Sequence, residues 1–217
     1  MKNILSIFLL VSSLAGTSQT PKQPVDYVDC MIGNHDSRWM QFPGASMPFG
    51  MVKLSPDNQR QGWKAGYEYE IENIAGFSHI HSWTMDGLLM MPTLGKLQTE
   101  PGKENDPDGG YRSRIRHETE VATPGYYSVL LDDTKIKAEI TTTTRAGFQR
   151  YTFPKSDSAR VMIDLQIESE YGTELYDAHI TKVSDTEIEG YTLQQSLRGA
   201  GWNEYQLYFV IRFNKPF

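Results

Sequence analysis

Two histidines stand one residue apart in the stretch GFSHIHSWTMDG, residues 76–87, and a tryptophan and an aspartate follow them. In an extended strand, side chains two residues apart point to the same face, so His79 and His81 can present two imidazole rings together. Such a pair can contribute to a metal site, which would need a third ligand from another histidine or a carboxylate such as Asp86. The alternative is a pair of histidines held in a core or a loop by backbone hydrogen bonds.

Carboxylates gather around the same part of the chain. Asp57, Glu68, Glu70 and Asp86 lie in or near the segments GWKAGYEYE and HSWTMDG. Hydrolysis of a glycosidic bond needs two carboxylates, one as the acid and the other as the nucleophile or base. Because the chain holds 27 Asp and Glu residues, such proximity is expected somewhere by number alone, and solvated loop carboxylates are the alternative.

Two tryptophans, Trp63 and Trp83, stand in the same two segments. A flat indole ring can cover the apolar face of a sugar. Both follow short expected strands and precede turns that contain glycine, so we predict that they lie on loops at one end of the molecule and share one concavity. Packing in the core is the alternative for each. With His79, His81 and Asp86, they form the candidate sugar-contacting set.

Composition narrows the class of protein. The 217 residues are 39% hydrophobic and 22% charged, which is ordinary for one globular domain. The formal net charge of -6, with no dense Lys/Arg block, is not the footprint of a nucleic-acid-binding protein. Cys30 is the only cysteine, so an internal disulfide and a CxxC redox motif are excluded. The sequence also lacks a phosphate-cradling glycine loop and a serine nucleophile elbow.

The N-terminus has the pattern of a secretory signal peptide. Residues 1–18 contain one lysine, an apolar run from Ile4 to Val11 and then small residues. Residues 19–24 follow as a polar linker that contains proline. The apolar run is too short to span a bilayer, and no other stretch approaches the roughly 20 residues required. We therefore expect an exported protein, periplasmic or secreted, without a membrane span.

The rest of the chain is patterned as short antiparallel strands. GYYSVLLDD and TKIKAEITTTTRAGFQRYTF alternate apolar and polar residues around a DDT turn, which predicts a hairpin. ARVMIDLQI, AHITKVSDTEIEGYTL and YQLYFVIRFNKPF repeat the pattern, with SDTE as a second turn. Residues 92–125 are polar and rich in Gly, Pro and Asp, which is typical of loops. Helical periodicity is not sustained beyond the signal, so an all-β antiparallel sandwich or barrel is predicted.

Five blocks of sequence resemble a known family. They are FPGASMPFGMVKLSPD, GYEYEIENIAGFSH, MMPTLGKL, ETEVATPGYYSVLLDDTKIKAEITTTTRAGFQRYTFP and YFVIRFNKPF. In this order they resemble the N-terminal part of glycoside hydrolase family 92, the exported, largely bacterial α-mannosidases. The match runs from about Val25 to Phe217. It implies that residues 25–217 form an N-terminal β-sandwich of the galactose-mutarotase-like (supersandwich) type.

The resemblance also implies a second domain. Family members join the sandwich to a C-terminal (α/α)6 barrel, which carries the catalytic glutamate and aspartate, and they invert configuration with the help of calcium. This chain stops at Phe217, before such a barrel, so we expect a sandwich incomplete at its C-terminus, with no catalytic residue or metal ligand assigned to it. We expect little glycosidase activity from it alone. The expected partners are the barrel and a mannose-containing glycan.

One motif departs from the family pattern. Many members read something like GFSHTHLSGTG, so His79 and His81 are kept here while bulkier residues, Trp83 among them, replace small ones. The sugar and the linkage are therefore left open. Three functions are compared. The first is the sandwich part of a family 92 glycosidase, the second is a free-standing carbohydrate-binding sandwich, and the third is an exported metal-binding β-protein that uses both histidines.

Overall fold

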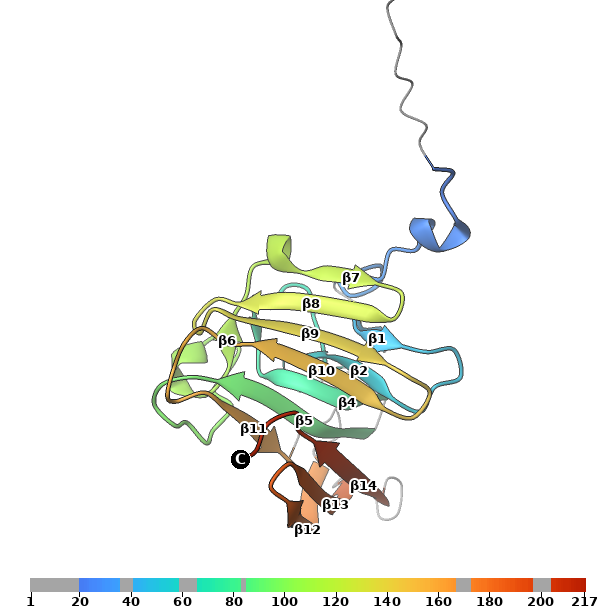
Figure 1. Cartoon of the computed structure of the whole chain (residues 1–217). Helices are drawn as coiled ribbons and strands as arrows, with labels where there is room; N and C mark the ends of the chain where they lie inside the picture. The colour runs from blue at the N-terminus through green and yellow to red at the C-terminus, as the bar shows by residue number, and fades with distance from the viewer. Residues whose placement is uncertain (1–19, 36–40, 59–65, 83–84, 167–172, 197–203) are drawn as a thin grey trace, which may run out of the picture.

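The computed structural model describes residues 20–35, 41–58, 66–82, 85–166, 173–196 and 204–217. In these residues every regular element is a β-strand or a short 3₁₀ helix, as the alternating sequence pattern predicts. Figure 1 shows how they are arranged. In chain order they are η1 (Pro24–Tyr27), β1 (Ala45–Ser46), β2 (Lys53–Asp57), β3 (Asn73–Ile74), β4 (Gly76–Ser82), β5 (Met85–Thr93), η2 (Pro107–Gly109), β6 (Ser113–Arg114), η3 (His117–Thr119), β7 (Val121–Thr123), β8 (Tyr126–Leu131), β9 (Ile136–Thr142), β10 (Gly147–Thr152), β11 (Arg160–Asp164), β12 (Thr173–Ser184), β13 (Glu187–Ser196) and β14 (Glu204–Arg212).

Two open sheets packed on one another form the body of the protein. The larger has the strand order β1-β2-β4-β5-β11, and the smaller has the order β10-β9-β8-β7. Every pairing of named strands is antiparallel. Figure 1 shows the two sheets as separate layers, and strands of both contribute to one hydrophobic core. The predicted all-β antiparallel fold is therefore confirmed, as a sandwich rather than a barrel.

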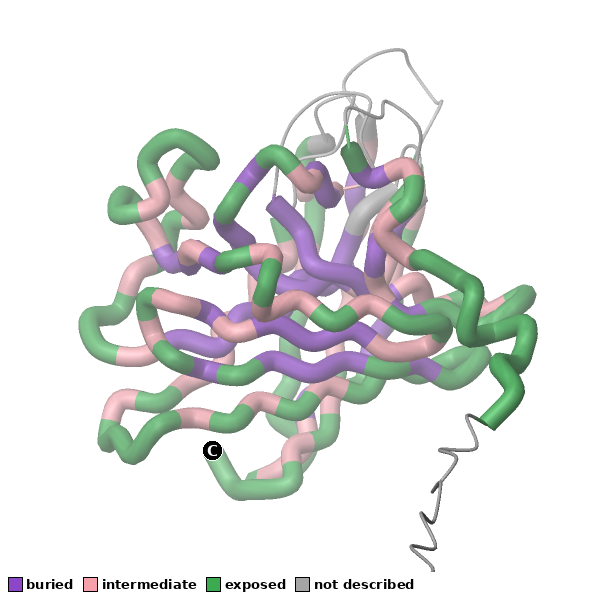
Figure 2. Tube along the Cα trace, turned by 90° about the horizontal axis from the view of Figure 1, so that it is seen from above, coloured by how far each residue is buried: buried purple, intermediate pink, exposed green. Residues whose placement is uncertain are grey.

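The core lies between these two sheets. Leu54 of β2, Phe77 of β4 and Leu89 of β5 belong to it, together with Tyr127 of β8 and Ile140 of β9, and all are at most 1% exposed. Burying each such side chain stabilises the fold by about 1.5–3 kcal/mol. Figure 2 shows the buried stretches as purple runs through the middle of the molecule.

A third sheet, with the order β12-β13-β14, lies below β5 and β11 in Figure 1. Ser184 and Glu187 pair where its first hairpin closes, at the predicted SDTE turn. The sheet is tied to the sandwich by the Gln194 side-chain amide, which donates to the backbone carbonyl of Leu165 at 3.1 Å, and by contacts between β14 and β5. β3 and β6 form a separate two-stranded sheet.

The other predicted turns and loops occur where the sequence places them. β8 and β9 form the expected hairpin, and Lys135 in its turn has φ +57°, a left-handed conformation. Residues 92–125 are mostly irregular, with η2, η3 and the short strands β6 and β7 among the loops. The expected signal peptide lies outside the described residues. In the part of the chain that is described, no helix is both long enough and apolar enough to cross a membrane.

Candidate functional site

The hairpin of β4 and β5 carries three of the predicted site residues. His79 and His81 lie on β4, and Asp86 on β5 pairs with His81 across the ladder. Trp63, Trp83 and the side chain of Asp86 lie outside the described residues. The shared concavity of the two tryptophans therefore stays a prediction. The described residues do show how the chain on either side of these segments is held.

His81 lies at the centre of a buried polar cluster, and it is only 1% exposed. Its Nδ1 donates to the backbone carbonyl of Lys53 at 2.9 Å, because a carbonyl oxygen can only accept. Nε2 is then the acceptor nitrogen, and it faces Oγ of Ser78 at 3.3 Å. The one proton of the Ser78 hydroxyl is donated to Oδ2 of Asp57 at 2.9 Å rather than to Nε2 of His81. Burial lowers the pKa of His81 to about 4, so the ring is neutral at neutral pH.

Gly66 brings the backbone after residues 59–65 against this cluster. Its φ is +88°, and a Cβ atom here would stand 2.9 Å from Oδ2 of Asp57 and 3.1 Å from Nε2 of His81. Glycine is therefore required both for the left-handed backbone and for space. The Gly66 carbonyl accepts a hydrogen bond from the backbone N–H of Asn58 at 2.6 Å. The segment that contains Trp63 thus leaves and rejoins the described chain beside His81.

Asn58 braces the same place with its side chain. It is fully buried, and its Nδ2 donates to the backbone carbonyl of Asn73 at 2.6 Å. Its Oδ1 accepts from the backbone N–H of Glu68, also at 2.6 Å. An amide is suited to this position because it offers a donor and an acceptor at once. The end of β2 is thereby joined to the chain that follows residue 66.

A second buried cluster, centred on Glu120, holds the next residues. The carboxylate accepts from the hydroxyl of Tyr67 at 2.9 Å and from the hydroxyl of Tyr127, and Nδ1 of His117 lies 2.5 Å from its other oxygen. The Glu120 side chain is 3% exposed. Burial, together with this carboxylate, raises the pKa of both tyrosines, so their hydroxyls remain donors. Three donors stabilise the buried carboxylate.

Residues 69 and 70 are also held in place. The ring of Tyr69 stacks on that of His117, with centroids 3.8 Å apart and planes 15° apart. The backbone N–H of Tyr69 donates to the carbonyl of Asn34 at 2.9 Å. On the surface, Oε1 of Glu70 lies 2.8 Å from Nδ1 of His35. The chain from residue 66 to residue 70 is therefore fixed by hydrogen bonds and stacking along its length.

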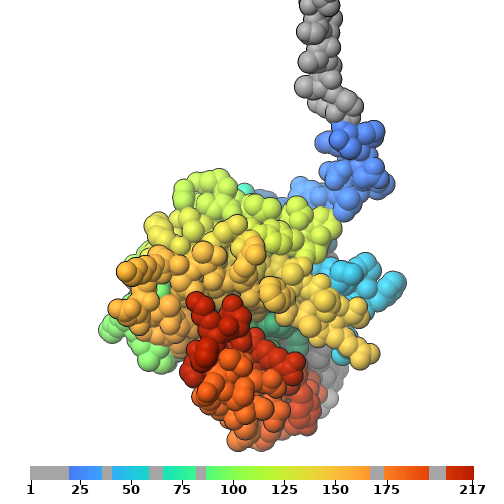
Figure 3. All heavy atoms as spheres, viewed as in Figure 1, coloured from blue at the N-terminus to red at the C-terminus, as the bar shows by residue number. Residues whose placement is uncertain are grey.

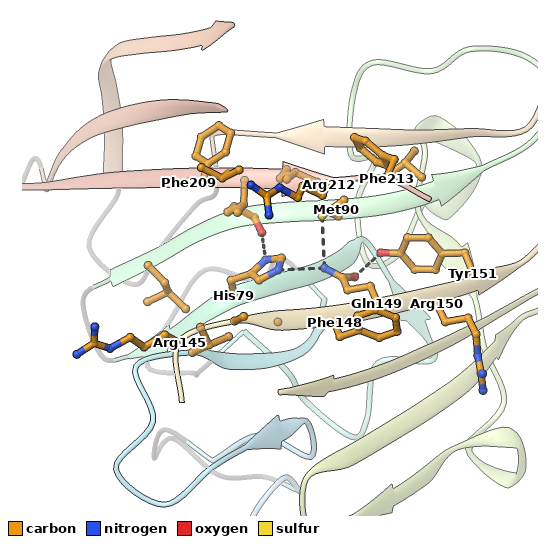
Figure 4. A pocket seen from close by; sticks show the side chains of 18 of the residues that line it. His79, Met90, Arg145, Phe148, Gln149, Arg150, Tyr151, Phe209, Arg212 and Phe213 are labelled. Atoms are coloured by element: carbon orange, nitrogen blue, oxygen red, sulfur yellow. Dashed lines mark hydrogen bonds between the residues drawn. The ribbon is translucent and has the colours of Figure 1, made fainter. Parts of the chain in front are cut away.

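His79 has different neighbours from His81. Its Nδ1 donates to the backbone carbonyl of Leu88 at 2.8 Å, and its Nε2 accepts from the side-chain amide of Gln149 at 3.2 Å. Leu88 has φ +52°, a left-handed conformation that is unusual for this residue type. Burial lowers the pKa of His79 as well. Figure 4 shows the ring hydrogen bonded to Gln149 of β10 on one side and to the backbone of β5 on the other.

The two histidines are therefore neutral hydrogen-bonded groups with separate partners. The described residues contain no group of three or more His, Cys, Asp or Glu side chains that could hold a metal ion. The metal-binding alternative has no support in this part of the chain. Asp57 and Glu68 are 1% and 4% exposed, which suits a structural role better than contact with a ligand. The arrangement is a rigid base that holds the chain on both sides of residues 59–65 and of residues 83–84.

A two-sheet sandwich whose loop ends are fixed by buried polar clusters belongs to a general class of protein, the rigid β-scaffold that carries loops at its surface. Residues 27–217 match the family model described as the glycosyl hydrolase family 92 N-terminal domain. The chain therefore belongs to glycosyl hydrolase family 92, as the five sequence blocks indicate.

Solved structures of the family share the fold. The GH92 α-mannosidase BT3965 of Bacteroides thetaiotaomicron has a TM-score of 0.83 and 34% identity, covering 91% of this chain and 27% of its own. Its complex with mannoimidazole gives a TM-score of 0.80 and 36% identity over 88% of this chain and 25% of its own. The GH92 inverting mannosidase BT2199 of the same organism, at 23% identity and a TM-score of 0.67 over 90% of this chain and 26% of its own, supports the fold alone.

A curated relative is also similar. The protein named "Uncharacterized secreted glycosidase" of Arthroderma benhamiae is 29% identical over 164 residues, which are 72% of this chain and 20% of that protein. The chain thus spans 20–27% of the length of these relatives.

Proposed function

We propose that this domain supplies sugar-contacting loops to an exported family 92 glycosidase that acts on mannose-containing glycans. Family membership supports the proposal, as does the similarity to an α-mannosidase that was solved with mannoimidazole. The single observation that carries it is the His81 cluster, which fixes both ends of residues 59–65 next to the β4–β5 hairpin. Trp63, Trp83 and Asp86 then contact the sugar, while His79 and His81 order the hairpin from within.

The catalytic pair belongs, in this proposal, to a second domain. An inverting glycosidase holds its acid and its base roughly 6.5–9.5 Å apart, with room for a water molecule. Of the described carboxylates near the hairpin, Asp57 and Glu68 are buried, and Glu120 is occupied by three hydrogen bonds. We therefore place both catalytic groups on the (α/α)6 barrel that the family resemblance implies.

Calcium is placed with the same second domain. Calcium takes six to eight oxygen ligands, most of them carboxylate or carbonyl oxygens. The described residues contain no group of three or more His, Cys, Asp or Glu side chains that could hold a metal ion, so they offer no carboxylate cluster for calcium. No step proposed for this domain uses the ion.

Export completes the proposal. Residues 1–18 have the charge, apolar run and small residues of a secretory signal peptide. The curated relative is named a secreted glycosidase. Amino-terminal sequencing of the protein recovered outside the cytoplasm should start after residue 18, whereas an intact Met1 would contradict export by this signal.

Hydrolysis and binding of α-mannosides test the proposed function. The purified chain alone should release no mannose, and the chain joined to a family 92 barrel should release it. Trp63→Ala and Trp83→Ala should each lower kcat/KM of the joined protein by about ten-fold or more, as expected for loss of a stacking contact of about 1.4 kcal/mol. Tyr27→Ala, an aromatic residue on η1 that is 72% exposed, is the matched control and should have no effect.

Other outcomes separate the alternatives. Mannose release by the chain alone that disappears in Asp86→Asn or Glu68→Gln would show that the carboxylates of this domain are catalytic. Tight binding of mannosides by the chain alone, with no gain of activity on joining the barrel, would favour the free-standing carbohydrate-binding sandwich.

A further inference from the structure

A groove of about 860 Å³ separates β10 from β14. Consecutive residues line both walls, 145–151 on one side and 207–214 on the other. His79, Leu88, Met90 and Val161 contribute to its floor. Figure 3 shows the surface of the β10 region directly beside the red β14 region, and Figure 4 shows the side chains that line the groove.

Both walls are edges of sheets. Among the described strands, β10 pairs only with β9, and β14 pairs only with β13. A strand that presents its face to a groove contributes alternate residues, whereas a strand that presents its edge contributes consecutive ones. The consecutive lining therefore means that rows of backbone N–H and C=O groups border the groove, and such rows are a template for another strand. The arrows of β10 and β14 point the same way in Figure 1, so one strand can run antiparallel to both.

Polar side chains of the β10 wall and of the floor are already hydrogen bonded to one another. The hydroxyl of Tyr151 donates to Oε1 of Gln149. Nε2 of Gln149 donates to Nε2 of His79 at 3.2 Å and lies 3.4 Å from the sulfur of Met90. Nδ1 of His79 donates to the carbonyl of Leu88. A sugar site needs polar side chains that converge on the ligand, but the hydrogen bonds of these side chains are made to one another. The backbone groups at the strand edges are therefore the ones that can bind a ligand.

We propose that the groove binds an extended polypeptide strand, which hydrogen bonds to the edges of both β10 and β14 and joins them into one continuous sheet. The source to which we commit is the part of a full-length family 92 enzyme outside the matched N-terminal region. The inference therefore rests on the proposed function, and it names the surface through which this domain engages the rest of that enzyme.

Exposed apolar residues indicate which side chains the strand carries. Phe148, Tyr208 and Val210 line the groove and are 67%, 69% and 58% exposed. The floor beneath them includes Met90 and Val161. Because side chains alternate along a strand, the bound segment needs apolar residues at every second position to cover this floor.

Charge adds a second requirement. The described lining residues include Arg145, Arg150 and Arg212 and no carboxylate. Arg150 and Arg212 each form an ion pair within their own sheet, with Glu139 and Glu187. Arg145 is exposed at the end of the groove next to β10. An acidic residue near that end of the bound strand is therefore favoured.

Hydrogen exchange with a synthetic strand tests the proposal. The probe is a peptide with the nine-residue length of β14, in which valine alternates with threonine and glutamate stands at each end. At saturation it should slow exchange by about ten-fold or more at alternate backbone amides of both β10 and β14, and leave β8 unchanged. Protection of neither strand at millimolar peptide, or of only one strand, would overturn the proposal.

N-methylated peptides test the contact with each edge separately. Methyl groups on alternate amide nitrogens block one edge of the peptide and leave the other free. A strand that bridges β10 and β14 tolerates neither of the two methylation patterns, so both modified peptides should lose protection at both strands. Full binding by either modified peptide would mean that a single edge suffices and would contradict the bridging geometry.

Variants of the chain provide the matched control. Val161→Arg places a charge on the groove floor and should weaken binding of the peptide by about ten-fold or more. Val183→Arg makes the same change on β12, at a half-exposed position outside the described groove lining, and should bind as the native chain does. Equal binding by both variants would contradict the proposed floor. If Val161→Arg does not fold, the methylated peptides still decide the question with the native chain.

The outcomes distinguish this inference from the proposed function. Loss of mannoside turnover in Trp63→Ala with no protection by the peptide would leave the function standing and overturn the groove. Protection of both strand edges by the peptide, with no effect of the tryptophan substitutions on turnover, would leave the groove standing and overturn the proposed role of the tryptophans.

Discussion

Acidification tests whether His81 is a buried neutral ring. The residue is 1% exposed, it donates to the carbonyl of Lys53, and burial lowers its pKa from an ordinary value of 6.5 to about 4. As the pH falls below 6.5, the unfolded chain therefore binds a proton that the folded chain does not. The free energy of unfolding must decrease from about pH 7 to about pH 4 because of this group. Each pKa unit corresponds to about 1.4 kcal/mol, so the loss at about pH 4 is about 3 kcal/mol.

The assay is urea unfolding of the native chain and of His81→Gln at several pH values between about 4 and 7. Glutamine keeps an amide donor for the carbonyl of Lys53 but does not titrate. The native chain should lose about 3 kcal/mol more than the variant over this range. Other groups titrate in both proteins and cancel. Among them is Glu139, whose pKa is lowered to about 2, chiefly by hydrogen bonds from Arg150. Its contribution to the free energy of unfolding is lost as the pH falls from about 4.5 through about 2, in both proteins alike.

Two results would refute the reasoning. A parallel loss of stability in both proteins would mean that the folded state of the native chain takes up the proton as readily as the unfolded state. A smaller loss in the native chain would mean that an imidazolium at His81 is stabilised through Ser78 by the carboxylate of Asp57, and that the buried ring is charged rather than neutral.

Two further predictions concern the clusters that hold the chain after residue 66. Gly66→Ala should cost about 3 kcal/mol or more in urea unfolding, whereas Gly95→Ala, with a similar φ of +77° but nothing within 4 Å of the added Cβ, should cost about 1 kcal/mol. Equal costs would show that close packing at Gly66 does not matter. Glu120→Ala removes the acceptor of Tyr67 and Tyr127 and should cost about 3–5 kcal/mol, while Glu120→Gln keeps one acceptor oxygen and should cost about half as much. The same assay checks this pair, and indistinguishable stabilities would contradict the role given to the carboxylate.

Much of the fold is predictable because strands are encoded locally. In β9, Ile136, Ala138 and Ile140 are buried while Lys137 is exposed, so the alternation in the sequence largely matches the burial in the structure. The exception is Glu139, which is buried and forms an ion pair with Arg150. The DDT and SDTE turns lie where turn-forming residues interrupt this alternation. The choice between sandwich and barrel depends on which strands pair across the whole chain. It followed from the family resemblance rather than from the pattern.

The candidate site is predictable only in part. The spacing of His79 and His81 identifies the strand, but their partners are distant in sequence. Lys53 is 28 residues from His81, and Gln149 is 70 residues from His79. Glu120 is 53 residues from Tyr67, and no local pattern links them. Such clusters form only when sheets pack, so one sequence without aligned relatives carries no signal for them.

The groove between β10 and β14 is hidden from the sequence for a similar reason. β10 alternates between exposed and half-buried residues, which is typical of any strand with one face exposed to solvent. Nothing in that pattern tells an edge strand from a central one, because both expose every second side chain. Only the strand order of the assembled sheets shows that two edges border the same groove.

β4 connects the two proposed surfaces of the domain. His79 and His81 are two residues apart on this strand. His79 lines the groove, and His81 packs against the chain next to residues 59–65. Both rings are neutral and hydrogen bonded to backbone carbonyls, so the strand is held rigidly between β2 and β5. A strand seated in the groove would bury His79 further and raise the cost of protonating it, without contact to His81. In the proposed enzyme, this rigid strand therefore leads into one sugar-contacting segment and braces the ends of the other. Along its side, it fixes the orientation of both segments to the rest of the enzyme. Positioning of this kind is required when an active site is completed by a second domain.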